Sequence, residues 1–139
     1  MTFKVSINKP NFNIVRQRAL FGTTRALQFL ATNINREIIN SMQRNDKTGQ
    51  INERRSKLLG ITYRRSAPQE ALSSDTGKSL AKVDYTIVNP FNIVGGFRKF
   101  GDNYVRKWEN NDDISARRPT VAKALQKTKS KINQTKQFF

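Results

Sequence analysis

The sequence predicts an α+β fold, in which one small antiparallel sheet packs against a long N-terminal helix and a C-terminal helix. Three observations predict it: a short alternating apolar pattern at the N-terminus, a long segment with apolar residues every three to four positions, and further alternating patterns after residue 82. The chain has 139 residues, the length of one ordinary domain. We therefore expect one core within residues 1–132, followed by a C-terminal tail at 133–139.

The N-terminal part of the chain predicts one strand and one long helical segment. Phe3, Val5 and Ile7 alternate with polar residues, as in a half-buried strand. From residue 11 the apolar positions recur at helical spacing, which predicts an amphipathic helix over about 11–44. Gly22 lies inside this pattern. Because glycine costs only about 1 kcal/mol relative to alanine in a helix, one slightly bent helix and two separate helices both remain open.

The middle of the chain predicts an extended loop and then two strands. Residues 45–80 are polar, basic and rich in Ser, Gly and Pro, as in a loop with short ordered pieces. Within this loop, residues 58–63 are expected to form a brief strand or a hairpin edge. Alternating apolar residues then predict a strand from Val83 to Asn89 and a second strand at Ile93-Val94. We expect this second strand to meet Gly95-Gly96 and to form a hairpin with the segment C-terminal to these glycines.

The C-terminal part of the chain predicts two helices. Tyr104, Val105 and Trp108 recur at helical spacing, which predicts a short helix over 103–109. Arg118-Pro119 is expected to open the last helix, because proline is well placed in a first helical turn. Beyond residue 133 we expect the tail to fray or to dock on a neighbouring subunit.

The chain is strongly basic. It has 26 Lys and Arg against 10 Asp and Glu, which gives a net charge of +16 and a pI of about 10.9. A charge of this size attracts polyanions and acidic protein surfaces. Nucleic acid or an acidic protein partner is therefore expected.

The residue types that are missing exclude several classes of function. The chain has no cysteine and no histidine, so disulfides, thiolate zinc sites, cysteine nucleophiles and Ser-His-Asp triads are all excluded. Neither a signal-peptide core nor an apolar run long enough to span a bilayer is found. We expect a soluble protein of the cytoplasm, or of an assembly built there, with no enzymatic activity, cofactor or membrane partner.

Two short clusters raise alternatives with simpler explanations. Glu109, Asp112 and Asp113 carry oxygen ligands suited to Mg²⁺, but their turn-like surroundings favour a solvated loop. The run from Gly95 to Gly101 has the glycines and cations of a phosphate-binding loop but lacks the Gly-Lys-Ser/Thr signature, so a flexible hairpin or hinge is the simpler interpretation. No metal site is expected from either cluster.

The basic side chains include two arginine doublets, Arg54-Arg55 and Arg64-Arg65, which lie in the predicted loop. Flexible cations of this kind can follow phosphates without fixed geometry. Aromatic residues suited to base stacking are missing from this loop apart from Tyr63, and helix-turn-helix, zinc-finger and basic-zipper patterns are absent. Direct contact with DNA therefore stays open at this point.

Two stretches of the chain, taken together, resemble a known family. Lys47-Thr48-Gly49, the run from Arg64 to Ala71 and the run from Asp75 to Leu80 are similar, in the same order, to motifs of the small neck and tail-completion proteins of tailed bacteriophages. Further along, the run from Tyr104 to Glu109 resembles the Tyr-x-x-x-x-Glu motif of these proteins, and the run from Arg118 to Leu125 resembles their Arg-Pro-Phe-x-x-x-Ala-Leu motif.

The chain departs from the family pattern at three places. Gln69 stands where the family has glycine, and Thr120 stands where it has phenylalanine. Residues 110–112 are Asn-Asn-Asp where the family usually has Phe-Gly-Thr. A turn can survive this last change, because Asn and Asp tolerate positive φ better than other residues with a side chain.

The resemblance implies a structural protein of the virion neck, assembled in the cytoplasm of a bacterial host. It implies a homo-oligomeric ring, hexameric or dodecameric, that completes the tail and joins the DNA-filled head to it. The implied partners are head-closure or connector proteins, tail-terminator or tail-tube proteins, and genomic DNA in passage. The alternative is a free, basic, non-enzymatic protein that binds nucleic acid.

The resemblance and the charge distribution together assign three sets of residues. The expected subunit or ring interface comprises Arg54, Arg55, Arg64, Arg65, Pro68, Asp75 and Thr76. The expected structural motif comprises Tyr104, Trp108, Glu109, Arg118 and Pro119, with Glu109 accepting hydrogen bonds from Arg117 or Arg118. The candidate DNA-facing set comprises Lys123, Lys127, Lys129, Lys131 and Lys136, and whether these lysines meet DNA or an acidic protein face stays open.

Overall fold

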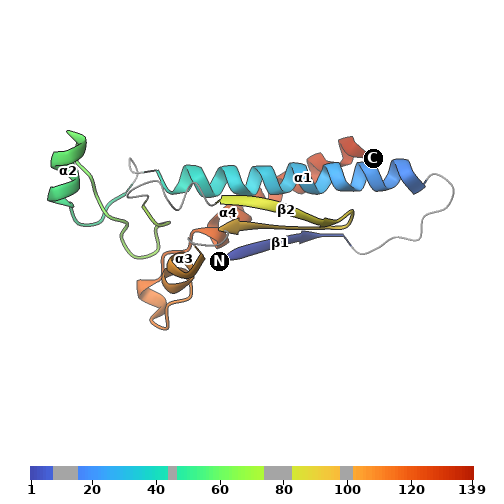
Figure 1. Ribbon diagram of the computed structural model, residues 1–139. Helices are drawn as coiled ribbons and strands as arrows, with labels where there is room; N and C mark the ends of the chain where they lie inside the picture. The colour runs from blue at the N-terminus through green and yellow to red at the C-terminus, as the bar shows by residue number, and fades with distance from the viewer. Residues whose placement is uncertain (8–15, 44–46, 74–82, 98–101) are drawn as a thin grey trace.

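The computed structural model describes residues 1–7, 16–43, 47–73, 83–97 and 102–139. The expected α+β fold is confirmed, since a three-stranded antiparallel sheet packs with an N-terminal and a C-terminal helix (Figure 1). The elements, in chain order, are β1 (Thr2–Ser6), α1 (Arg16–Ser41), α2 (Glu53–Leu59), β2 (Val83–Asn89), β3 (Asn92–Phe97), α3 (Asp102–Glu109), the 3₁₀ helix η4 (Ile114–Ala116), α4 (Val121–Thr128) and the 3₁₀ helix η5 (Lys129–Phe138).

The sheet has the strand order β1-β3-β2, with both pairs antiparallel. The hairpin joins β3 to the preceding strand β2, and its turn is fixed by the Phe91 amide donating to Asn89 Oδ1 at 2.9 Å. The expected hairpin between β3 and the segment C-terminal to it is therefore wrong, because β1 and β2 occupy both edges of β3.

Gly95 and Gly96 lie inside β3 rather than in a turn or hinge. A Cβ on Gly95 would lie 2.7 Å from Cζ of Phe3 on the neighbouring strand. Gly96 has a φ of +105°, which residues with a side chain rarely adopt. Both glycines thus serve the packing of the sheet. The rest of the glycine-containing run, residues 98–101, lies outside the described part of the chain.

One face of the sheet packs against α1. Phe3, Ile93 and Phe97 are buried on this face, whereas Thr2 and Lys4 are exposed on the other, as the alternating sequence pattern predicts. The helix α1 contributes a stripe of apolar residues at helical spacing to the same core. This stripe comprises Leu27, Ala31, Ile34, Ile38 and Met42.

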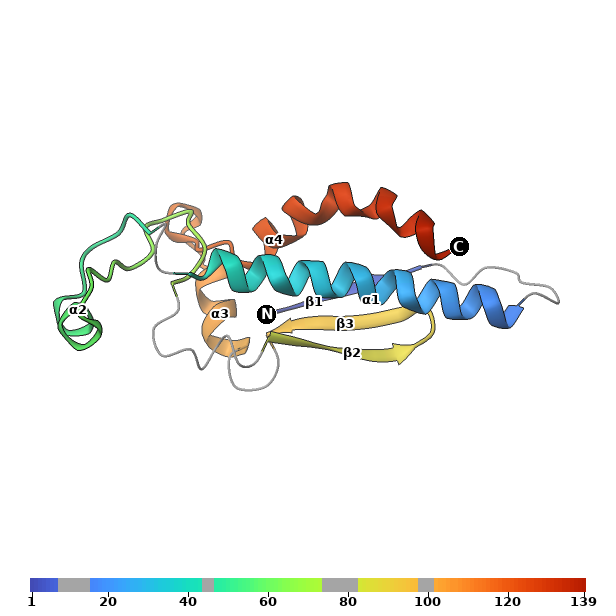
Figure 2. The same ribbon diagram turned by 90° about the horizontal axis from the view of Figure 1, so that it is seen from above.

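The helix α1 runs without a break through Gly22, so the alternative of two separate helices is excluded. Seen from above, α4 and η5 lie alongside α1, on the side away from β2 (Figure 2). A Cβ on Gly22 would overlap the carbonyl oxygen of Phe138 in η5. Glycine at this position lets the C-terminal segment approach the helix closely.

The C-terminal tail is ordered on its own chain. The rings of Phe29 in α1 and Phe138 in η5 lie 5.5 Å apart, and the Arg25 guanidinium lies 5.7 Å from the Phe138 ring centre. The expectation that the segment from residue 133 frays is therefore wrong, whereas its contact with a neighbouring subunit stays a prediction. The tail does not fray because of the Phe138 anchor, which packs where Gly22 leaves room.

We expect Gly22→Ala to release this tail while leaving α1 helical, because alanine favours a helix by about 1 kcal/mol but its Cβ displaces Phe138. Hydrogen exchange should show faster exchange over residues 129–138 and unchanged exchange over α1. Thr32→Ala, at an exposed position of the same helix, is the matched control. Unchanged protection of the tail in the glycine variant would contradict this account.

The two C-terminal helices agree with the prediction apart from one boundary. The short helix expected at 103–109 is α3. The last helix begins at Val121 with Thr120 as its N-cap residue, so Pro119 lies before the cap rather than in the first turn. Among the described residues, no helix combines the length and the apolar character needed to cross a membrane.

Candidate functional site

Residues 47–73 form an arm that projects from the body of the protein, with α2 at its far end (Figure 1). Its two stems run antiparallel, because the Gly49 amide donates to Arg65 O, the Arg65 amide to Gln50 O, and the Asn52 amide to Tyr63 O, each at 2.9 Å. We call residues 47–50 and 65–73 the arm root, and residues 53–62 the arm tip. The arm is thus built by paired backbone, not by irregular loop.

The helix α2 was not predicted, since residues 58–63 were expected to form a strand or hairpin edge. Asn52 caps its start by accepting a hydrogen bond from the Arg55 amide at 3.1 Å, and Gly60 ends it in the left-handed conformation. Ser56 Oγ accepts a hydrogen bond from the Tyr63 amide at 2.8 Å, which ties the helix to the returning stem. These caps order the tip although no residue of α2 is buried.

Glu70 holds the two stems together at the arm root. Its carboxylate accepts hydrogen bonds from the amide and the hydroxyl of Thr48 on one stem, and from the Ala67 amide at 2.8 Å on the other. Burial by itself would raise the pKa of Glu70, but the hydrogen bonds from Thr48 and Ala67, with the charge of Lys47, outweigh it and lower the pKa. The ionised carboxylate is therefore the form that holds the arm root.

We expect Glu70→Gln to weaken the arm root most at neutral pH. A lowered pKa contributes stability above the ordinary value of 4.5 and loses it as the pH falls through the folded-state pKa. Hydrogen exchange of the Thr48 and Ala67 amides, compared between wild type and variant at each pH, should show a protection ratio that shrinks below pH 4.5. A ratio that stays constant down to about pH 3 would contradict this role.

Glycine is required at position 49, where the backbones of the two stems approach each other closely. A Cβ on this residue would overlap the carbonyl oxygen of Arg65, the same atom that accepts the Gly49 amide. The side chain of Arg64 also donates to Gly49 O, at 3.2 Å. The Thr48-Gly49 pair noted in the sequence thus meets the Arg64-Arg65 doublet directly.

The arm root is joined to the body through the segment that precedes α4. The Leu72 amide donates to Thr120 Oγ1 at 3.0 Å, and Arg118 Nε donates to Ser66 O at 3.3 Å. Gln69 donates from its amide to Arg117 O at 2.8 Å and from its side chain to Ile114 O at 2.7 Å. Thr120 and Leu72 are buried, so their hydrogen bond anchors the junction in the core, whereas Gln69 joins it at the surface.

Glu109 has a different partner from the one expected. Its carboxylate accepts hydrogen bonds from the amides of Val121, at 3.1 Å, and Ala122, at 2.7 Å, so it caps α4 from the end of α3. The expected pairing with Arg117 or Arg118 is wrong, because those side chains donate to backbone carbonyls instead. Burial raises the pKa of Glu109, and the hydrogen bonds from Ala122 and Val121 offset only part of this rise.

Trp108 and Arg118 stack on each other. The Arg118 guanidinium lies 5.2 Å from the centre of the Trp108 ring, within the range of a cation–π contact. The Arg118 amide also donates to Trp108 O at 2.9 Å. Of the other expected motif residues, Pro119 directly follows Arg118 and is half-buried, and Tyr104 lies in α3 with its side chain outside the described part of the structure.

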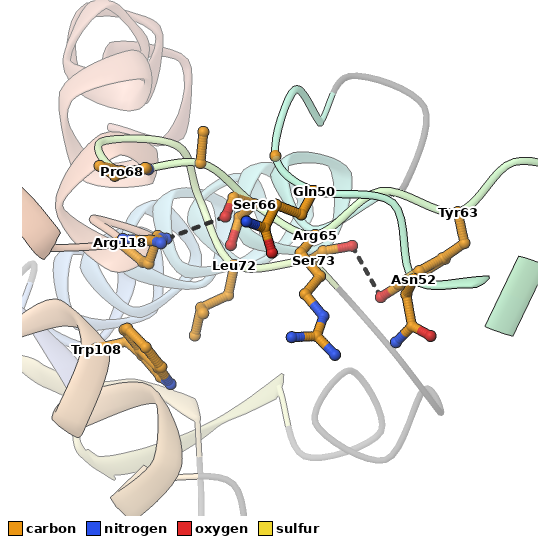
Figure 3. Close-up of a pocket in the computed structure, with 12 residues that line it drawn as sticks. Gln50, Asn52, Tyr63, Arg65, Ser66, Pro68, Leu72, Ser73, Trp108 and Arg118 are labelled. Atoms are coloured by element: carbon orange, nitrogen blue, oxygen red, sulfur yellow. Dashed lines mark hydrogen bonds between the residues drawn. The ribbon is translucent and has the colours of Figure 1, made fainter. Parts of the chain in front are cut away.

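An open pocket of about 570 Å³ lies between the arm root and the body. Arg65 reaches into it from the arm, while Trp108 and Arg118 line it from the body (Figure 3). Tyr63 and Ser73 also line the pocket, and Ser73 Oγ donates to the Tyr63 hydroxyl at 3.0 Å. Two cations in one partly open pocket suit an acidic side chain or a phosphate group.

The structure brings most of the expected interface residues onto the arm. Arg54 and Arg55 lie in α2, Arg64 and Arg65 on the returning stem, and Pro68 at the arm root. Apart from the half-buried Arg55, these residues are exposed. Asp75 and Thr76 lie outside the described residues. The role of these seven residues in a subunit interface stays a prediction.

The candidate DNA-facing lysines lie on α4 and η5, well away from the arm tip (Figure 2). Lys127, Lys129 and Lys136 are exposed, whereas Lys123 and Lys131 are half-buried. The described residues contain no group of three or more acidic side chains that could hold a metal ion. Glu109 is turned toward α4, away from such a role.

The sequence reasoning missed the residues that fasten the arm. Glu70 and Thr48 were part of the resembling motifs but received no role, and Thr120 was noted only as a departure from them. The available signal was Asn52, a residue type that favours the N-cap position of a helix. No local pattern marks the pairing of Thr48 with Glu70, which are 22 positions apart. Comparisons of the chain with protein-family models, with curated proteins and with solved structures found no match.

Proposed function

We propose that this protein is a non-enzymatic structural component of a tailed-bacteriophage neck, forming a ring that joins the DNA-filled head to the tail. The observation that carries the proposal is the meeting of the motif residues at the arm root. Thr48-Gly49, Glu70 and Arg118 are far apart in the sequence, yet the first two bind each other and Arg118 binds the same segment through Ser66. A shared motif order is expected where such distant residues build one structural junction.

The backbone at Gln69 supports the same proposal. Gln69 has a φ of +70°, a conformation that favours glycine, and it stands where the resembling family has glycine. Two hydrogen bonds to residues 114 and 117 hold it there. The departure from the family pattern is therefore compatible with the same turn.

The shape of the molecule also suits a ring component. Closed rings need contacts between two different surfaces of neighbouring subunits. A projecting arm with exposed cations offers one such surface, and it can reach beyond the body of its own chain (Figure 1). The net charge of +16 suits docking on acidic faces of adjoining rings or lining a passage for DNA.

Inactivating the gene in the phage that encodes this protein tests the proposal. We expect DNA-filled heads and separate tails that lack this ring to accumulate side by side without joining, as seen by electron microscopy. Supplying the wild-type protein from a plasmid should restore joined particles. Infectious particles formed without the protein, or a failure at DNA packaging instead, would overturn the proposal.

The exposed lysines of α4 and η5 favour a second candidate, a free protein that binds nucleic acid. Binding of this kind releases counterions, so the affinity should fall steeply with salt. Replacing Lys127, Lys129 and Lys136 by Gln should reduce the slope of log K against log[salt] by about 2–3. Absence of binding at low salt would exclude this candidate.

A further inference from the structure

We propose that the arm tip of one copy docks on an acidic turn of the next copy, residues 111–115, in a head-to-tail contact. The proposal rests on the ring-forming part of the proposed function, and it names the two surfaces that meet. The contact involves two copies of this chain and neither DNA nor another phage protein.

The arm tip presents an apolar and basic face without a covering element among the described residues. Arg54, Lys57 and Leu58 are exposed and lie three and four positions apart on α2, so they share one face of the helix. Leu58 is 67% exposed, and the nearby Ile61 is 53% exposed. Exposed leucine and isoleucine at the end of an ordered, capped projection are typical of a docking surface.

The acidic turn presents the complementary chemistry. Asp112 and Asp113 are exposed, and Ile114 beside them is 67% exposed. The turn is held in place, because Asn111 Oδ1 accepts the Asp113 amide at 3.0 Å and Asp113 Oδ1 accepts the Ser115 amide at 3.0 Å. The hydrogen bonds from the Ser115 side chain and amide also lower the pKa of Asp113, which keeps this carboxylate charged.

Charge selects this pairing of surfaces. The arm tip, residues 53–62, holds three basic side chains and one acidic side chain, whereas residues 111–115 hold two Asp and no basic side chain. The guanidinium nearest this turn, that of Arg117, is turned to the Asn111 carbonyl at 2.9 Å. Each surface adds an exposed aliphatic side chain next to its charges. One contact would therefore bury apolar area on both sides while opposite charges meet at its rim.

The two surfaces stand apart within one chain, which makes the contact intermolecular. In both views α2 and the segment containing η4 are separated, and Gln69 fastens η4 to the arm root rather than to its tip (Figures 1 and 2). A contact between two different surfaces repeats from copy to copy, and it closes into a ring when the rotation between copies allows it.

Disulfide crosslinking tests the contact cleanly, because the chain has no cysteine of its own. Purified Leu58→Cys and Ile114→Cys proteins, mixed and oxidised, should give a 58–114 crosslinked dimer, and the double variant should give a ladder of multimers. Leu58→Cys mixed with Leu125→Cys, an exposed position on α4, is the matched control and should give no specific product. A missing 58–114 product at millimolar protein, or a dominant 58–58 product, would overturn the proposal.

Charge exchange tests the chemistry of the same contact. We expect Arg54→Glu/Lys57→Glu in the Leu58→Cys protein to lower the yield of the 58–114 product at least tenfold. Combining it with Asp112→Lys/Asp113→Lys in the Ile114→Cys protein should restore the yield. Lys127→Glu/Lys129→Glu makes the same change in net charge elsewhere and should have little effect. Equal losses from both charge reversals would overturn the pairing.

This test and the test of the neck function have separate outcomes. A 58–114 crosslink in a protein that is absent from virions would leave the contact standing and remove the neck function. A protein that is present in the neck but gives no 58–114 crosslink would leave the neck function standing and remove the contact.

Discussion

Glu109→Ala is expected to lower the free energy of unfolding by about 2–4 kcal/mol. The substitution leaves the amides of Val121 and Ala122 without their acceptor at the start of α4, and an unsatisfied buried donor costs about 1–3 kcal/mol. Because α4 packs Val121 and Ala124 into the core, loosening its first turn also disturbs that packing. Urea unfolding followed by circular dichroism measures the loss.

Two further variants separate the capping role from a general loss of charge. Glu109→Gln keeps one acceptor oxygen and should fall between wild type and the alanine variant. Asp113→Ala removes a fully exposed carboxylate that also accepts a backbone amide, and should cost much less. If Glu109→Ala unfolds at the same urea concentration as wild type, the carboxylate does not hold α4.

Reversing the charges of Arg64 and Arg65 is expected to abolish head–tail joining while leaving the fold intact. The stems pair through backbone atoms, and the side-chain hydrogen bond that is lost, from Arg64 to Gly49 O, is an exposed one, so the arm survives the change of side chains. The substitution to Glu replaces the cation that reaches into the pocket at the arm root by an anion, which repels an acidic partner surface (Figure 3). Infectious titre should fall to the level of the gene-inactivated phage.

The control for this experiment is Lys127→Glu/Lys129→Glu, which changes the net charge equally, on helices well away from the arm. This variant should still give joined particles if the arm cations carry the docking. Circular dichroism spectra and unfolding midpoints of both variants should match those of wild type. Normal infectious particles from the Arg64/Arg65 variant would contradict the docking role of the arm.

The layered core was predictable because apolar periodicity records which faces are buried. Phe3 and Val5 predicted β1, and the stripe through Leu27 and Ile34 predicted α1. The close approaches were not predictable from periodicity. Gly22 serves contact with Phe138, and Gly95 serves contact with Phe3, yet both glycines were interpreted through their effect on local backbone alone.

The arm was not predictable from local sequence patterns. The helix α2 is short and buries nothing, so no apolar stripe marks it, and its existence depends on the Asn52 cap and on Gly60. The motif order indicated that Thr48, Glu70 and Arg118 matter, but not how they act. Their roles depend on hydrogen bonds across up to 52 positions of sequence, which spacing along the chain does not reveal.

Quantitative mass spectrometry of purified virions, referenced to the portal protein, tests the neck function most directly. We expect the protein in the particle at a fixed low ratio to the portal, as one ring of six or twelve copies requires. Absence from purified virions, or a variable ratio that follows the DNA content, would contradict a structural place in the neck.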